Sequence, residues 1–192
     1  MNIFVVSYNP RSCAICLDDI RLNKMIVETG QLLSTAYRMW YGQRGPIFTN
    51  SLKFKADYPY CLPGELVLES YYRQGLIDLA SYINHPCTVW ARQKPEHYAW
   101  LWLLMYNMLE EYTFRFDKQH GNQKKLTPLA QVDFPVLGHG LWQQVEHFID
   151  CSDQPENDWP IYARYRECLR NKWSNDTIKL TWTKRPFPQW AL

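Results

Sequence analysis

The sequence predicts a mainly α-helical fold: a single compact domain over residues 1–192 with a short N-terminal strand. Hydrophobic residues make up 46% of the chain and aromatic residues 16%, which indicates a folded globule and excludes a disordered chain. Two long segments carry apolar residues at steps of three and four, the spacing of one helix face. A length of 192 residues fits one ordinary domain, so we treat the basic, aromatic segment 160–192 as part of it.

The N-terminal quarter predicts a strand and two helices. The apolar residues 3–6 form the expected strand, which Asn9-Pro10 ends. A helix should start near Ser12 and break at Asp18-Asp19, because either aspartate can cap a second helix that ends near Trp40. Residues 43–64 hold several prolines and glycines with little periodicity, and they predict a long loop.

The rest of the chain predicts helices joined by turns. The expected helices span residues 65–83, 87–92, 95–121, 141–149 and 161–173. Pro86 disfavours a helical His85 and therefore separates the first two. The segment that begins at Pro95 is the most hydrophobic of these helices, so we expect it at the centre of the fold.

The helix expected from Asp19 to Trp40 carries a polar stripe beside its apolar one. The polar stripe consists of Arg21, Lys24, Glu28, Gln31, Thr35 and Arg38. One interpretation is a solvated face on which Lys24 and Glu28 form an ion pair at i,i+4. The other is a helix edge that faces a cleft, and periodicity alone leaves both open.

A second candidate site is the turn Asn84-His85-Pro86. His85 can carry a proton near neutral pH, and Asn84 can bond to a base edge or a sugar. The alternative is a helix-ending turn with His85 packed against the core. For Glu111 and Arg115, at i,i+4 in the favourable order, we expect a structural pair and not a catalytic one.

The C-terminal segment is basic and aromatic. From Pro160 to Leu192 there are seven Lys or Arg against Glu167 and Asp176, interleaved with aromatic rings. Such a pattern suits a nucleic-acid backbone. It is equally typical of a basic helix and an aromatic tail that pack onto the domain.

Several classes of protein are excluded by absent signals. There is no P-loop, Rossmann glycine pattern, HExxH or GxSxG motif, and His85-Pro86-Cys87 lacks both halves of the zinc-deaminase pattern. Cys13 and Cys16 form a lone CxxC without a second pair, so we expect no metal. No signal peptide or membrane-length apolar run is present, which predicts a cytoplasmic protein with reduced thiols and no membrane partner.

Five stretches together resemble a family of small proteins found in tailed-phage genomes and in bacteria. They read DDIRLNKMIVETGQLLSTAYR, NHPCTVWAR, HYAWL, EEYTFR and TWTKRPFPQW, and the resemblance covers nearly the whole chain. The family is similar to DNA glycosylases that act on modified phage bases, including an anti-phage enzyme that excises glucosylated hydroxymethylcytosine. A looser similarity is to phage pyrimidine-dimer glycosylases, which are also small and helical.

In the pyrimidine-dimer enzymes, an amine exposed by removal of Met attacks the sugar, and a Glu on an early helix assists. Glu28 matches that Glu by analogy. Asn at position 2 predicts that Met1 is retained. The amine nucleophile of the pyrimidine-dimer enzymes is therefore not expected in this chain.

The resemblance implies a monofunctional DNA glycosylase that flips a modified pyrimidine out of double-stranded DNA and needs no cofactor. A carboxylate near C1′ would stabilise the positive charge that builds on the deoxyribose. Glu28 or Asp19 would be that carboxylate, and the pocket would contain Lys24, Gln31, Asn84 and His85. The candidate phosphate contacts are Arg164, Arg166, Arg170, Lys184 and Arg185. The alternatives are a phage-type base-modifying transferase or pyrophosphorylase, and a non-enzymatic binding factor.

Overall fold

The computed structural model describes residues 2–48, 54–63, 75–137, 140–154 and 158–192. Its helices are α1 (Pro10–Cys16), α2 (Asp19–Tyr41), α3 (Pro86–Gln93), α4 (Pro95–Phe116), α5 (Leu126–Leu129) and α6 (Ile161–Asn175). Short 3₁₀ helices span Gly121–Lys125 (η1), Leu141–Gln144 (η2) and Gln189–Ala191 (η3). Strands β1 (Gln43–Phe48) and β2 (Phe54–Cys61) pair antiparallel. The prediction of a mainly α fold is confirmed.

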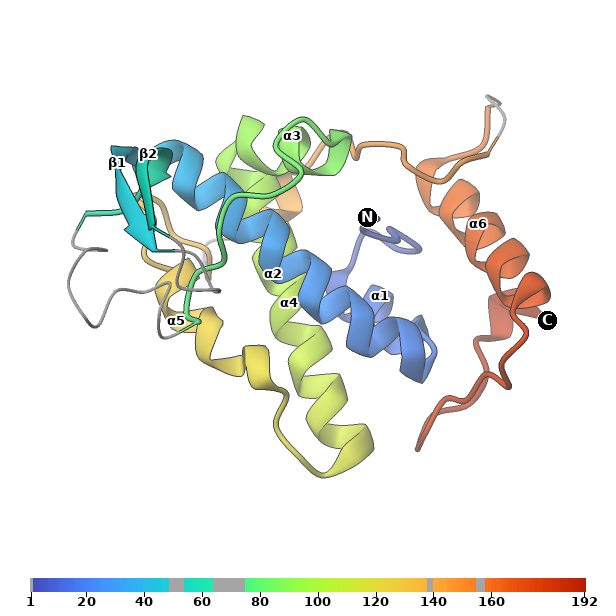
Figure 1. Ribbon diagram of the computed structural model, residues 1–192. Helices are drawn as coiled ribbons and strands as arrows, with labels where there is room; N and C mark the ends of the chain where they lie inside the picture. The colour runs from blue at the N-terminus through green and yellow to red at the C-terminus, as the bar shows by residue number, and fades with distance from the viewer. Residues whose placement is uncertain (1, 49–53, 64–74, 138–139, 155–157) are drawn as a thin grey trace.

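Helices α2 and α4 form the centre of the molecule. Figure 1 shows them crossing, with α1 and α3 beside them and α6 on the opposite side of the N-terminal segment. The aromatic side chains of α4 hold neighbouring segments through their polar atoms: Trp100 Nε1 donates to the Tyr8 carbonyl at 2.8 Å, and Tyr98 Oη to the Leu129 carbonyl at 2.8 Å. The expected central position of this hydrophobic helix is therefore confirmed.

Both early helices begin at side-chain caps. Asn9 Oδ1 accepts hydrogen bonds from the first turn of α1, which starts at Pro10, two residues before the expected Ser12. Asp18 Oδ1 accepts from the backbone N–H groups of Ile20 at 3.1 Å and Arg21 at 2.9 Å, so Asp18 is the cap of α2. Asp18-Asp19 does break the helix as the sequence predicts.

Thr35 and Arg38, at the C-terminal end of the polar stripe on α2, are buried. Arg38 donates to the backbone carbonyls of Asp78 at 2.6 Å and Tyr60 at 3.0 Å. Thr35 Oγ1 donates to the Ser81 carbonyl at 3.0 Å and accepts from the Ser81 N–H at 3.0 Å. These two side chains hold the irregular segment 75–83 and β2 against α2, so this end of the stripe is neither solvated nor part of the cleft lining described below.

Three local predictions were wrong in the first half of the chain. Residues 3–6 are buried but form no strand. Phe4 has a φ of 40°, and its backbone N–H donates a hydrogen bond to Asn2 Oδ1 instead of to a neighbouring strand. The segment 43–64, expected as a loop, contains the hairpin of β1 and β2. Of the expected helix 65–83, residues 75–83 are irregular and not helical, and residues 65–74 lie outside the described residues.

Two later helices are shorter than predicted. Helix α4 ends at Phe116 and not near Gly121, since Asp117 adopts the left-handed conformation that terminates a helix. Of residues 141–149, only Leu141–Gln144 is helical, as the 3₁₀ helix η2. Carbonyls after it accept from distant side chains: Trp90 Nε1 donates to His147 at 2.9 Å and Tyr165 Oη to Ile149 at 2.8 Å.

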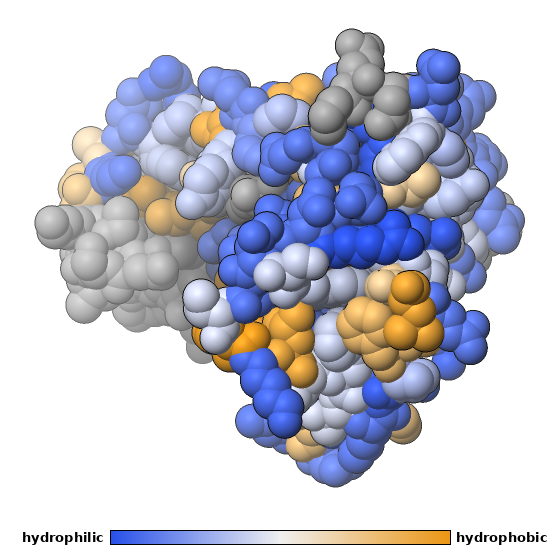
Figure 2. Space-filling view, turned by 90° about the vertical axis from the view of Figure 1, so that its right-hand side faces the viewer, coloured by the Kyte–Doolittle hydropathy of each residue, from blue (hydrophilic) through white to orange (hydrophobic). Residues whose placement is uncertain are grey.

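The C-terminal segment packs onto the domain through its aromatic residues. The Trp173 ring stacks on Trp190 and meets Trp182 edge to face. Figure 2, which views the molecule from the side that carries α6, shows a face of hydrophilic residues interrupted by separate hydrophobic patches. Among the described residues, no helix has both the length and the apolar character that a membrane crossing requires.

We expect Asp18 to be a main determinant of stability. Besides capping α2, its fully buried carboxylate accepts from Trp173 Nε1 at 2.8 Å and pairs with Arg21 at 2.9 Å. Replacement Asp18→Ala removes the cap and leaves a buried indole N–H without a partner, which should lower the free energy of unfolding by roughly 2–4 kcal/mol. Urea unfolding measures this loss, with the exposed Asp158→Ala as control. Equal stabilities of the two variants would contradict the assigned role.

Candidate active site

A cleft of about 770 Å³ lies between α2 and α6. One wall is the N-terminal half of α2, with Ile20, Arg21, Lys24, Met25 and Glu28. The other wall comes from residues 152–154 and from α6 and the residues after it, including Asn171, Lys172, Asn175 and Ile178. Asn2 and Phe4 of the N-terminal segment also line it. The N-terminal half of the polar stripe therefore faces a cleft, as one of the two interpretations requires.

Glu28 is the most enclosed of the three carboxylates in this lining. Its side chain is 17% exposed, against 33% for Asp176, and Asp153 is largely exposed. Asp176 is also engaged by Arg21 at 2.7 Å. The ion-pair partner of Glu28 is Lys24, whose Nζ lies 3.6 Å from Glu28 Oε1 and whose side chain is 67% exposed. Glu28 is thus a partly buried carboxylate beside an exposed cation, an arrangement that suits a group acting on a bound ligand.

The turn before α3 lies near Glu28 but does not line the cleft. His85 caps α3 by accepting the Cys87 N–H at 3.2 Å, and α3 packs against α2. Burial lowers the pKa of the His85 imidazole, and the negative charge of Glu28 acts in the opposite direction. Asn84 is exposed and Gln31 is half-buried, and neither lines the cleft.

Asp19 holds the C-terminal segment onto the start of α2. It accepts from Thr181 Oγ1 at 2.8 Å, from Thr183 Oγ1 at 2.8 Å and from Arg115 Nη1 at 3.0 Å, and it does not line the cleft. Partial burial opposes its ionisation, but the hydrogen bonds from Thr183, Thr181 and Arg115 outweigh this and lower the pKa of Asp19. The geometry is that of a structural clamp.

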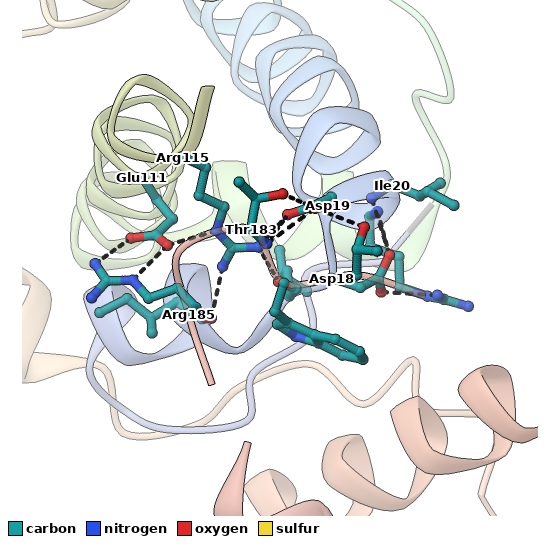
Figure 3. A network of polar contacts seen from close by, with 12 residues as sticks. Asp18, Asp19, Ile20, Glu111, Arg115, Thr183 and Arg185 are labelled. Carbon is teal, nitrogen blue, oxygen red and sulfur yellow. Dashed lines mark hydrogen bonds and ion pairs between the residues drawn. The ribbon is translucent and has the colours of Figure 1, made fainter. Parts of the chain in front are cut away.

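A second buried carboxylate completes this network, which Figure 3 shows from close by. Glu111 on α4 pairs with Arg115 at 2.7 Å, as the i,i+4 spacing predicts, and with Arg185 at 2.8 Å. Burial works against ionisation, yet the two guanidinium groups lower the pKa of Glu111. Through Asp19 and Arg115, the network joins α2, α4 and the C-terminal segment.

The five basic residues expected to contact phosphate all have partners within the chain. Arg164 pairs with Asp150 at 2.8 Å, Lys184 with Asp117 at 2.7 Å, and Arg185 with Glu111. Arg166 donates to the Val6 carbonyl at 3.0 Å and lies over the rings of Tyr162 and Trp190. Arg170 pairs with Glu167 at 3.1 Å and also donates to the Trp190 carbonyl. Much of the basic character of this segment thus serves to attach it.

Several residues that line the cleft were not expected from the sequence. Asn2 was considered only for its effect on Met1, and no role was assigned to Asn171, in the helix expected over 161–173, or to Asn175, just beyond it. Their spacing of four residues on one helix face was visible in the sequence, but nothing local indicates that this face lies opposite Glu28. Among the described residues, no group of three or more His, Cys, Asp or Glu side chains could hold a metal ion.

A partly buried carboxylate on an early helix, set in a polar cleft, is an arrangement that suits an enzyme cleaving glycosidic bonds. The family model for pyrimidine dimer DNA glycosylase matches residues 1–123, and the chain belongs to this family. It is therefore a DNA glycosylase that acts on pyrimidine lesions, and the predicted enzyme class is confirmed. No curated protein and no solved structure matches the chain.

The lowered pKa of Asp19 makes stability depend on pH. Its pKa in the folded chain lies below the value of about 3.9 expected after unfolding. The contribution of Asp19 is therefore fully present above the unfolded pKa and is lost as the pH falls through the folded pKa. We expect the free energy of unfolding to fall less steeply below about pH 4 in Asp19→Asn than in the wild type. Urea unfolding across a pH series tests this, with Asp158→Asn as control, and parallel curves for all three proteins would refute it.

Proposed function

We propose that this enzyme hydrolyses the N-glycosidic bond of a modified pyrimidine in phage DNA, with glucosylated hydroxymethylcytosine as the substrate, and leaves an abasic site. The observation that carries the proposal is the position of Glu28, a partly buried carboxylate inside a cleft large enough for an extruded nucleotide. Removal of such a base from invading DNA would serve in defence against phage.

Glu28 is the carboxylate that we assign to the chemistry. Departure of the base leaves positive charge on the deoxyribose, and a fixed carboxylate near C1′ stabilises this charge or activates the attacking water. Asp19, the other candidate, has its oxygens occupied by Thr181, Thr183 and Arg115 and lies outside the cleft lining. We therefore place Asp19 in the scaffold of the site and Glu28 at the reacting centre.

The cleft also suits a flipped base with a bulky polar substituent. Its volume of about 770 Å³ lies within the roughly 300–1,000 Å³ range of small-molecule sites, and it exceeds what a bare pyrimidine ring needs. Its lining mixes amide, hydroxyl and charged side chains with a few apolar ones. Lys24 stands at its exposed edge, where an ammonium group can meet the DNA backbone. His85, Asn84 and Gln31 would act from the periphery, next to Glu28.

Replacement Glu28→Gln tests the catalytic assignment, because it keeps the shape and removes the charge. Loss of one preorganised electrostatic contact should lower the single-turnover excision rate by about 10²–10³-fold. DNA affinity should change little, since the ground-state sugar is neutral. Release of the base from modified duplex DNA measures the rate, and Glu110→Gln, an exposed glutamate of α4, is the matched control.

A folded Glu28→Gln protein with a normal rate would overturn this assignment. Asp19→Asn then becomes the decisive variant. If it too retains full activity, the carboxylate mechanism fails altogether.

DNA binding by the C-terminal segment is tested through its salt dependence. Arg170 and Lys184 have side chains 42% and 39% exposed, more than Arg164 at 16% and Arg185 at 27%. If Arg170 and Lys184 each contact a phosphate, the double replacement by alanine should reduce the slope of log affinity against log salt by about two units. Arg44→Ala, at an exposed arginine of β1, serves as control. An unchanged slope would exclude this surface.

A further inference from the structure

We propose that the α6 wall of the cleft, formed by Asn171, Lys172 and Asn175, selects the base that the enzyme excises. The ligand class is a pyrimidine whose ring carries a neutral, hydroxylated substituent. This inference rests on the proposed glycosylase reaction at Glu28 and extends it, because it assigns substrate choice to a part of the cleft separate from the reacting carboxylate.

The two walls of the cleft differ in their relation to the family. The α2 wall with Glu28 lies inside residues 1–123, the part that matches the pyrimidine dimer DNA glycosylase model. The α6 wall lies outside that part. A substitution on α6 can therefore change what fits opposite Glu28 without touching the carboxylate, which makes α6 the natural location for substrate selection.

The α6 wall has hydrogen-bonding capacity to offer. Within the described part of the chain, the side chains of Asn171 and Lys172 make no hydrogen bond or ion pair. Asn175 Nδ2 donates to the Asn171 carbonyl at 2.7 Å, which leaves its side-chain oxygen as an acceptor. Two amides and an ammonium group supply both donors and acceptors. A hydroxylated group uses both kinds of partner, whereas a phosphate or a carboxylate accepts only, so the amide pair favours the neutral substituent.

The wall is also held at a fixed distance from α2. Trp173 Nε1 donates to Asp18 Oδ2 at 2.8 Å, and Asp176 pairs with Arg21 at 2.7 Å. Both contacts join α6 and its C-terminal end to the first turn of α2. A wall fixed in this way can discriminate between substituents, because the protein does not rearrange to satisfy a ligand that lacks the matching groups.

The test compares excision from three duplexes that differ in one nucleotide. One carries glucosylated hydroxymethylcytosine, one hydroxymethylcytosine without the sugar, and one a thymine dimer. For the wild type and for Asn171→Ala, Lys172→Ala and Asn175→Ala, kcat/KM is measured on each duplex. Matched controls are Asn23→Ala on α2 and Lys179→Ala, which are exposed residues outside the cleft lining.

The wild type should prefer the glucosylated base. Each α6 variant should lose about tenfold on that substrate, the size of one hydrogen bond, while its rate on hydroxymethylcytosine stays near that of the wild type. The controls should match the wild type on all three duplexes. Urea unfolding midpoints verify that each variant is folded.

Two results would overturn the inference, and they are distinguishable. If the wild type excises a base with dependence on Glu28, but the α6 variants keep its ratio of rates among the three duplexes, the wall does not select the substrate and the proposed chemistry still stands. If the wild type excises none of the three, the proposed function itself fails, and the inference fails with it.

Discussion

The arrangement of the helices depends on the hydrogen bonds and ion pairs that the two adjacent carboxylates Asp18 and Asp19 accept from other segments of the chain. Asp18 caps α2 and accepts the buried indole N–H of Trp173, while Asp19 accepts from Thr181, Thr183 and Arg115. One dipeptide thereby attaches α4, α6 and the C-terminal segment to the first turn of α2. Because each carboxylate is buried or partly buried and has several partners, removal of one partner leaves charge or polar groups unsatisfied.

This attachment creates the cleft between α2 and α6. Glu28 lies two to three turns along α2 from the two aspartates, and the facing wall belongs to a helix more than 130 residues later in the chain. The wall stands opposite Glu28 because Trp173 and Asp176 are tied to Asp18 and Arg21. Asp18 and Asp19, at the start of α2, thus fix the surrounding segments in place, while Glu28, farther along the same helix, lines the cleft.

The polar stripe of α2 has two roles along its length. Toward the N-terminus, Arg21, Lys24 and Glu28 line the cleft. Toward the C-terminus, Thr35 and Arg38 are buried and satisfy backbone groups of residues 75–83 and β2. A polar side chain at helical spacing indicates only that polar groups lie opposite, and here these belong to a cleft at one end of the stripe and to an irregular chain segment at the other.

The sequence by itself determined the helical class, the extent of α2 with its cap at Asp18-Asp19, and the central position of α4. It also determined the pairing of Glu111 with Arg115. These features depend on helix propensities and on contacts between residues about four positions apart. The resemblance carried by its motifs pointed to a glycosylase and to Glu28. Only the tertiary structure decided that residues 3–6 form no strand, that β1 and β2 pair, and that Asp19 is a clamp. It also decided that the five candidate phosphate contacts of the C-terminal segment have partners within the chain, and that Asn171 and Asn175 line the same cleft as Glu28. Each of these outcomes depends on groups far apart in the chain, whose desolvation and hydrogen bonding are settled only when the whole domain is packed.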